Sequence, residues 1–288
     1  MTLAIEPRSH DLGGGFTVRR AVPTLQMRSV GPFVFVDHMG PAVFEPGAGI
    51  DVRPHPHIGL ATVTFLWSGG LRHRDTLGSL QDILPGDVNW MTAGRGIAHS
   101  ERTPPGLRAD GHPLHGMQTW VGLPQRHEDT APAFHHHPAD TLPQLARRGA
   151  LLRLIAGRAH GEESPVRAFG EILNVAIDLD ADAETAIEPG SRERALYVLE
   201  GEAQLDGADV PARRLLVLDP GATARLRAKT PLKAMLFGGE PLDGRRHLWW
   251  NFVSSSQERI EQAKADWRAG RFGTIPGDDE EFIPLPER

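Results

Sequence analysis

Short apolar segments alternate with turn residues along the whole chain. Segments rich in Val, Leu, Ile, Thr and Phe are bounded by glycines and prolines, a pattern typical of β-strands. The predicted strands lie at residues 33–36, 61–66, 88–91, 117–123, 152–156, 195–199, 215–218 and 232–237. Closely spaced strands with turn signals between them predict an all-β sandwich or barrel architecture.

One helix is predicted near the C-terminus. Ser255 followed by Glu258 forms a capping-box start, and Gly273 stands where a helix-terminating glycine belongs. Between them, apolar side chains recur at helical spacing and form one stripe. The stripe consists of Ile260, Ala263 and Trp267. We therefore expect a helix that packs on the β-structure and carries no chemistry of its own.

Residues 125–148 differ from the rest of the chain because they are rich in Pro, His, Asp and Ala. This composition predicts a solvated domain linker, with a short helix at residues 142–148. Within it lies the run His135-His136-His137. Adjacent residues of an extended chain point to opposite sides, so these three side chains cannot easily converge on one ion. We assign the run to the linker.

Composition narrows the class of protein. The 288 residues suffice for one large or two ordinary domains. The absence of cysteine excludes disulfides, iron–sulfur clusters, thiolate zinc sites and cysteine nucleophiles. A formal net charge of -6 argues against direct attraction to nucleic acid or to an anionic membrane. No signal-peptide core and no apolar run of about 18 residues is present, so we expect a cytoplasmic protein.

Two short strings carry the candidate chemistry: His55-Pro56-His57 and His99-Ser100-Glu101. On a β-strand, residues i and i+2 point to the same face, so each string can act as a pincer on one side of a sheet. Two such pincers can supply three imidazoles and one carboxylate to a single ion. This ligand set suits Fe, Mn, Ni, Cu or Zn better than Mg or Ca.

An internal repeat indicates two domains. An apolar strand ending in glycine, a variable hairpin and a Pro-Gly turn occur at residues 62–69 and 84–88, and again at residues 195–201 and 217–221. The second copy contains no histidine pair. We therefore predict an N-terminal metal-binding domain at residues 1–139. A C-terminal domain without metal ligands, ending in the helix and a tail, would occupy residues 140–288.

The glycine spacing around the two strings points to a known family. Gly49-x5-His55-x-His57 and Gly96-x2-His99 resemble the two cupin motifs. Around them the chain resembles the pirin family in the strings PGDVNWMTAGRG at 85–96, LHGMQTW at 114–120 and GEPL at 239–242. The resemblance implies an all-β bicupin of two β-barrel (double-stranded β-helix) domains with a C-terminal helix, and a monomer.

The same resemblance implies the site. In pirins one metal, usually iron, lies in the N-terminal barrel, and by position its ligands are His55, His57, His99 and Glu101. Many cupins and pirins carry a Glu where this chain has Ala61, and many pirins carry an Arg where it has Ile58. The carboxylate ligand must therefore be Glu101 or be absent.

Three functional hypotheses follow. The first is a mononuclear non-haem dioxygenase that opens a flavonol-like aromatic enol with O2, as quercetin 2,3-dioxygenases do. Glu101 would act as the catalytic base that accepts the 3-hydroxyl proton, and the cofactor would be one divalent metal, Fe first, with Ni, Mn, Cu or Zn as alternatives. The second is a non-catalytic, iron-dependent redox sensor that acts through a protein partner. The third is an enzyme whose substrate is not a flavonol.

Other histidines are assigned structural roles. His73 and His115 lie in segments that can approach the barrel interior, and burial with a hydrogen-bond partner is the common state of such residues. Asp37 and His38 match a pirin motif at the entrance of the first barrel, where we also expect a structural role.

Overall fold

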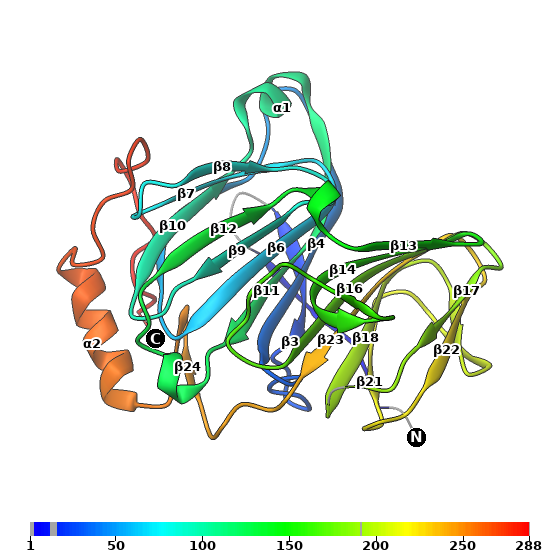
Figure 1. Cartoon of the computed structure of the whole chain (residues 1–288). Coiled ribbons are helices and arrows are strands. Elements are labelled where there is room, and N and C mark those ends of the chain that lie inside the picture. The colour runs from blue at the N-terminus through cyan, green and yellow to red at the C-terminus, as the bar shows by residue number, and fades with distance from the viewer. Residues whose placement is uncertain (1–2, 12–15, 191, 288) are drawn as a thin grey trace. The chain divides into compact units, whose positions relative to one another are not determined.

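A computed structural model describes residues 3–11, 16–190 and 192–287, and almost all of its regular structure is β (Figure 1). Contacts divide the chain into two compact bodies. The N-terminal body comprises Ser9–Val18, Asp37–Ala139 and Leu242–Arg288, and the C-terminal body comprises Met1–Arg8, Arg19–Val36 and Asp140–Pro241. The all-β class with a C-terminal helix is thereby confirmed, while the predicted domain boundary at 139/140 stays a prediction.

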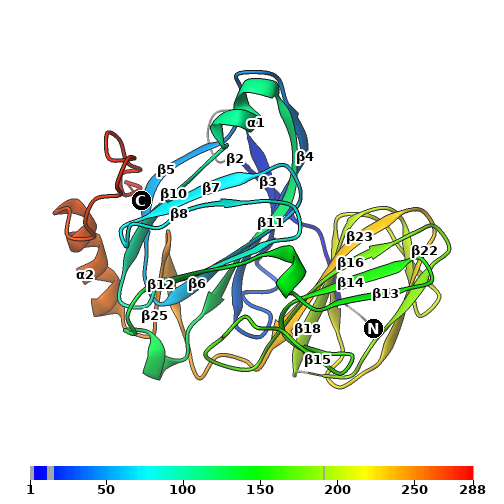
Figure 2. The same ribbon diagram turned by 45° about the horizontal axis from the view of Figure 1, so that its top comes forward.

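The N-terminal body is built mainly from two sheets. The smaller sheet has the order β5 (Asp51–His57), β10 (Ile97–Arg102), β7 (Leu71–Asp75), β8 (Leu80–Ile83). The larger sheet has the order β12 (Ala133–His137), β9 (Val88–Thr92), β6 (Leu60–Ser68), β11 (His112–Gly122), β4 (Phe33–Phe44), β3 (Thr17–Val22), β2 (Arg8–Asp11). A short helix, α1 (Pro105–Asp110), joins β10 to β11 (Figure 2).

The C-terminal body repeats this plan. Its larger sheet has the order β1 (Leu3–Ile5), β21 (Arg214–Leu218), β18 (Glu193–Glu200), β23 (Leu232–Gly239), β16 (Ile172–Leu179), β14 (Ala150–Ala159), β13 (Gln144–Arg147), with β15 (Glu162–Glu163) on β14. Its smaller sheet has the order β17 (Glu184–Ile187), β22 (Ala224–Ala228), β19 (Ala203–Leu205), β20 (Ala208–Val210). Alternate residues of both sheets, among them Val175, Leu196 and Leu226, form one buried apolar cluster between them.

Every predicted strand is present, and the repeat is real but misaligned in one turn. The sheet orders make β6 equivalent to β18, β9 to β21, β10 to β22 and β5 to β17. Pro85-Gly86 precedes β9, whereas Pro220-Gly221 follows β21. The two Pro-Gly turns are therefore not equivalent. The same residues recur because any exposed connection between strands favours proline and glycine.

The predicted linker contains strands. Residues 125–148 form two 3-10 turns, η1 (Gln125–His127) and η2 (Ala139–Thr141), and the strands β12 and β13. The short helix at 142–148 was a wrong prediction, because β13 pairs with β14 there and Leu145 packs on the core of the C-terminal body. An available sheet edge outweighs local propensity.

The His135-His136-His137 run was wrongly assigned to a solvated linker. It lies in β12, opposite Val88, Asn89 and Trp90 of β9. His136 Nδ1 lies 2.7 Å from Asn89 Oδ1, whereas His135 is exposed. Because neighbouring side chains alternate along the strand, the run does not converge on one point.

The C-terminal segment folds onto the N-terminal body as β24 (His247–Trp249), β25 (Phe252–Ser254) and α2 (Gln257–Arg268). The N-cap is Ser256, one residue after the predicted start, and its Oγ accepts a hydrogen bond from Arg259 N–H at 3.2 Å. The helix ends before Gly270, which adopts a left-handed conformation, and does not reach Gly273. The predicted stripe is buried against Ile58, Ala98 and Phe252. No helix of the described residues is long and apolar enough to cross a membrane.

Candidate metal centre

Strand pairing brings the two histidine strings together. β5 and β10 are antiparallel neighbours, with His99 opposite His55 and Ile97 opposite His57. The three imidazole centroids lie 4.4 to 5.0 Å apart. One nitrogen from each of His55, His57 and His99 lies within 4.8 Å of the others. The three side chains are buried, so the site is a closed cluster of nitrogen donors inside the N-terminal body.

The backbone fixes the tautomers of two of these rings. His55 Nδ1 lies 2.9 Å from the Arg53 carbonyl oxygen, and His57 Nδ1 lies 3.2 Å from the Asn251 carbonyl oxygen. A carbonyl only accepts hydrogen bonds, so Nδ1 carries the proton in both rings and Nε2 keeps its lone pair. Both Nε2 atoms are thus available as metal ligands.

The unpartnered nitrogens fit a metal ion. Among the described residues, Nε2 of His57 and Nε2 of His99 are buried and have no hydrogen-bond partner. Buried polar atoms without a partner are rare in folded proteins and require an explanation. A cation bound between the three rings satisfies both atoms, whereas a purely structural role leaves them uncompensated.

Burial also keeps the rings in the ligand-competent state. Removal from water lowers the pKa of His55 to about 4. It holds the pKa values of His57 and His99 well below the ordinary range, and neighbouring imidazoles add to the effect. The rings are therefore neutral near pH 7, which is the form that binds metals.

Glu101 is held beside the cluster by two polar side chains. Its Oε1 accepts hydrogen bonds from Gln118 Nε2 at 3.2 Å and from Thr64 Oγ1 at 3.4 Å. Desolvation raises the pKa of this half-buried carboxyl group. The group whose donor atoms lie within 4.8 Å of one another comprises the histidines alone. Glu101 as fourth ligand and as catalytic base stays a prediction.

Sequence reasoning missed one partner of the site. His73 is buried as expected, but its Nδ1 lies 3.3 Å from His99 Nδ1. Its Nε2 lies 2.9 Å from Asp75 Oδ2, and its ring stacks on Phe134 at 4.2 Å. Metal-binding histidines are commonly held by a hydrogen-bonded partner outside the ligand set, which here is a histidine that is itself bonded to a carboxylate. The signal was present as His73-x-Asp75, which places both side chains on one face of β7.

His38 and His115 form a separate pair. Their Nε2 atoms lie 3.0 Å apart, both residues are buried, and His115 stacks on Trp67. Asp37 is buried as well. Neither histidine belongs to the nitrogen cluster. The structural assignment of this pair agrees with its burial and pairing. Trp120, which sequence reasoning did not single out, contacts the His57 ring edge-on at 5.0 Å.

The equivalent strands of the C-terminal body, β17 and β22, carry no histidine. Opposite positions on β17 and β22 are Thr185 with Leu226 and Ile187 with Ala224. A cavity of about 860 Å³ lies in this body, with apolar wall residues including Val175 and Ile187. Within the described part of the chain, the only cluster of potential metal donors is the one formed by the three histidines.

Comparison with known proteins places this geometry in a family. The model of the pirin family matches residues 15–121, and the model of the pirin C-terminal cupin domain matches residues 174–273. A pirin-like protein of Caulobacter vibrioides is 48% identical over 289 residues, covering 99% of both chains.

Two further relatives carry a functional name. The "Putative quercetin 2,3-dioxygenase" of Pseudomonas aeruginosa is 39% identical over 94% of this chain and 85% of that protein. The crystal structure of a quercetin 2,3-dioxygenase from Acinetobacter baumannii superimposes with a TM-score of 0.92 at 34% identity, covering 100% of this chain and 96% of the other. Sequence, paired sheets and histidine cluster together show that the chain belongs to the pirin family and has its bicupin fold.

Proposed function

We propose that the protein is a mononuclear non-haem metal dioxygenase that opens flavonol-type aromatic enols with O2 and releases carbon monoxide. The observation that carries the proposal is the cluster of three neutral, buried imidazoles, two of whose Nε2 atoms are unpartnered. The names of the Pseudomonas and Acinetobacter relatives support the choice of reaction and substrate.

The metal would be held by His55, His57 and His99, with Glu101 completing the set. Three nitrogen donors and one carboxylate suit Fe, Ni, Mn, Cu or Zn, and the resemblance to pirins puts Fe first among them. When bound, the ion supplies Lewis acidity to a chelating enol hydroxyl. The protein contributes the fixed ring orientations, since His55 and His57 are each tied to a backbone carbonyl through Nδ1.

Glu101 is the group that would accept the substrate's hydroxyl proton. Desolvation raises its carboxyl pKa, so it is a stronger base than a solvated glutamate. Gln118 and Thr64 hold one carboxylate oxygen, which fixes the direction of the other. The deprotonated, electron-rich enolate is the species that reacts with O2, and the ring opens with loss of CO.

Oxygen uptake with quercetin by the Fe²⁺-loaded full-length protein tests the proposal. His57→Ala should lose metal and uptake together. Glu101→Gln, which preserves size and hydrogen bonding, should lower kcat by about 10²- to 10⁴-fold, the usual contribution of a general base. His136→Gln removes a histidine that pairs with Asn89 outside the cluster and serves as the matched control. It should retain wild-type uptake.

Two results would contradict the proposal. Uptake that is unchanged in His57→Ala would show that the reaction does not use this cluster. A fully metal-loaded wild type that consumes no oxygen with quercetin, with other flavonols or with simpler aromatic enols would show that the protein is not an oxygenase of this class.

A further inference from the structure

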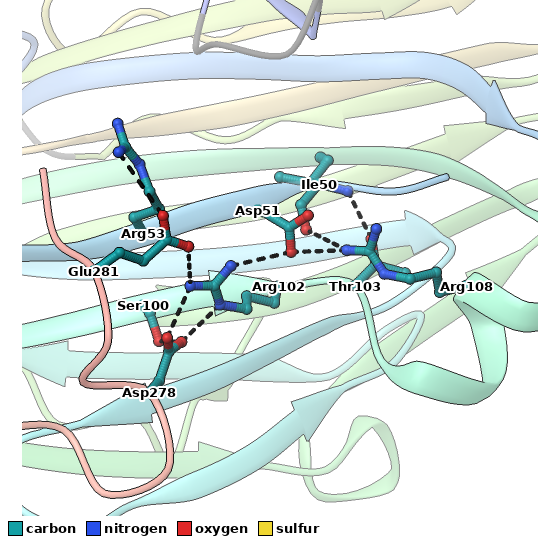
Figure 3. A network of polar contacts seen from close by, with 9 residues as sticks. All are labelled: Ile50, Asp51, Arg53, Ser100, Arg102, Thr103, Arg108, Asp278 and Glu281. Atoms are coloured by element: carbon teal, nitrogen blue, oxygen red, sulfur yellow. Dashed lines mark hydrogen bonds and ion pairs between the residues drawn. The ribbon is translucent and has the colours of Figure 1, made fainter. Parts of the chain in front are cut away.

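The C-terminal segment touches the outer side of the strand that carries His99 and Glu101. Along β10 the side chains alternate, so Ser100 and Arg102 lie on the opposite side from His99 and Glu101. Figure 3 shows both residues directed toward Asp278. Asp278 accepts hydrogen bonds from Ser100 Oγ at 2.7 Å, from Arg102 Nε at 2.7 Å and from Arg102 Nη2 at 2.8 Å. The Asp278 carboxylate therefore binds both residues that flank Glu101.

This contact falls where the pairing of β5 and β10 is irregular. His99 lies opposite His55, but Glu101 lies opposite Val52, so β5 carries one extra residue between these two pairs, whereas β10 pairs with β7 without interruption. Such a bulge re-aims the neighbouring side chains and leaves backbone groups without ladder partners. The tail supplies one of these partners, because Ile283 N–H donates to the Pro54 carbonyl at 2.8 Å.

Arg102 extends the contact to the beginning of β5. Its Nη2 donates to Glu281 Oε1 at 3.0 Å, and its Nη1 donates to Asp51 Oδ1 at 3.3 Å (Figure 3). Arg108 in α1 donates to the same Asp51 oxygen at 2.7 Å. The tail, both ligand strands and α1 are thus joined in one network of charged groups.

The segment also reaches the other histidine string. Its Asn251 carbonyl accepts from His57 Nδ1, and Val253 N–H donates to the Ile58 carbonyl at 3.2 Å. Gly59 permits this approach: a Cβ there would lie 1.9 Å from the Val253 oxygen, and its φ of +67° favours glycine. Each of the two ligand strings is therefore contacted from outside by residues 251–283.

We propose that residues 251–283 form a clasp that sets the aim of the metal-binding side chains, and that Asp278 is its positioning residue for His99 and Glu101. The inference rests on the proposed metal site. Mutation of residues that hold metal ligands in place from outside the ligand set commonly changes metal affinity by about 10- to 100-fold. β5 bends at its bulge beside the part of β10 that Asp278 contacts, so an external anchor there holds the two ligand strands in their pairing.

Binding of Co²⁺ to the full-length protein tests the clasp, because the visible spectrum of bound Co²⁺ reports coordination geometry. Asp278→Asn should raise the Kd for Co²⁺ by about 10- to 100-fold and alter the spectrum. Ser100→Ala leaves the Arg102–Asp278 ion pair in place and should cause a smaller change in the same direction. Asp266→Asn is the matched control. Asp266 pairs with Arg271 at 2.6 Å within the same C-terminal segment, and this pair contacts neither ligand strand. It should retain the wild-type Kd and spectrum.

The outcomes separate this inference from the function on which it rests. If Asp278→Asn and Ser100→Ala bind Co²⁺ with the wild-type Kd and spectrum while His99→Ala does not bind it, the clasp is refuted and the metal site stands. A lower unfolding temperature of the metal-free variants with an unchanged Co²⁺ spectrum would likewise overturn the positioning role, since that pattern describes a purely structural contact. Failure of the wild type to bind metal would overturn both proposals.

Discussion

Asp75 does not belong to the nitrogen cluster, yet it should control which nitrogen of His99 carries the proton. Its carboxylate only accepts hydrogen bonds, so His73 Nε2–H donates to Asp75 Oδ2. When His73 carries a single ring proton, on Nε2, its Nδ1 accepts from His99 Nδ1–H, which leaves the lone pair of His99 on Nε2, the atom that is buried and unpartnered. The chain from Asp75 through His73 to His99 selects the metal-binding tautomer.

Asp75→Asn should reverse this chain. Asp75 Oδ1 accepts from Leu77 N–H at 2.9 Å and from Ser79 N–H at 3.0 Å, so the oxygen of an asparagine must stay on that side. Its NH2 group then faces His73 Nε2 and donates to it. The proton of His73 moves to Nδ1, and the proton of His99 moves to Nε2, where it blocks coordination.

The magnitude follows from burial. Asp75 is 0% and His73 is 4% exposed, so water cannot relieve a mismatched contact. Restoring the ligand tautomer of His99 sets two donors against each other, and one unmade buried hydrogen bond costs about 1–3 kcal/mol. At 1.4 kcal/mol for each tenfold change, metal binding should weaken by roughly 5- to 150-fold.

Competition titration of Ni²⁺ against a chromophoric chelator measures this change, and nitrogen NMR of the imidazoles reports the tautomers of the metal-free protein. Asp82→Asn is the matched control, because Asp82 pairs with Arg72 on the same hairpin and not with His73. A wild-type Ni²⁺ affinity in Asp75→Asn, or an unprotonated Nε2 of His99 in that variant, would refute the reasoning.

Two further predictions concern stability. The pKa of His55 is about 4 in the folded protein against an ordinary 6.5, so the folded state takes up the proton less readily. The unfolding free energy of the metal-free protein should therefore fall by about 3 kcal/mol for this group as pH falls from 6.5 to 4. Urea titrations of His55→Gln should show a shallower fall, and a curve parallel to that of the wild type would be the contrary result. Arg246 and Glu128 form an ion pair at 2.6 Å, and their side chains are 4% and 8% exposed. Arg246→Met should therefore lower the free energy of unfolding, measured by chemical denaturation, by about 3–5 kcal/mol, and the double variant with Glu128→Leu should recover part of this loss. Strict additivity of the two single-variant losses would contradict the pairing.

Local pattern was sufficient for the parts of the fold that depend on neighbours in sequence. Alternation and turn residues located the strands, and the i, i+2 spacing of His55 with His57 and of His99 with Glu101 placed each pair on one face. Where a tertiary edge competed with local propensity, as in β12 and β13, the sequence-based interpretation was wrong. Strand pairing there offered backbone hydrogen bonds that no local pattern records.

By itself, the sequence determined the strands, the two donor strings and the family resemblance, because each is written in residues close together along the chain. Only the tertiary structure decided what stands behind those donors. The partner of His57 lies 194 residues away at Asn251, and the partner of Ser100 lies 178 residues away at Asp278. Periodicity tells which face a side chain occupies, but hydrogen bonds between distant segments depend on how the whole chain packs.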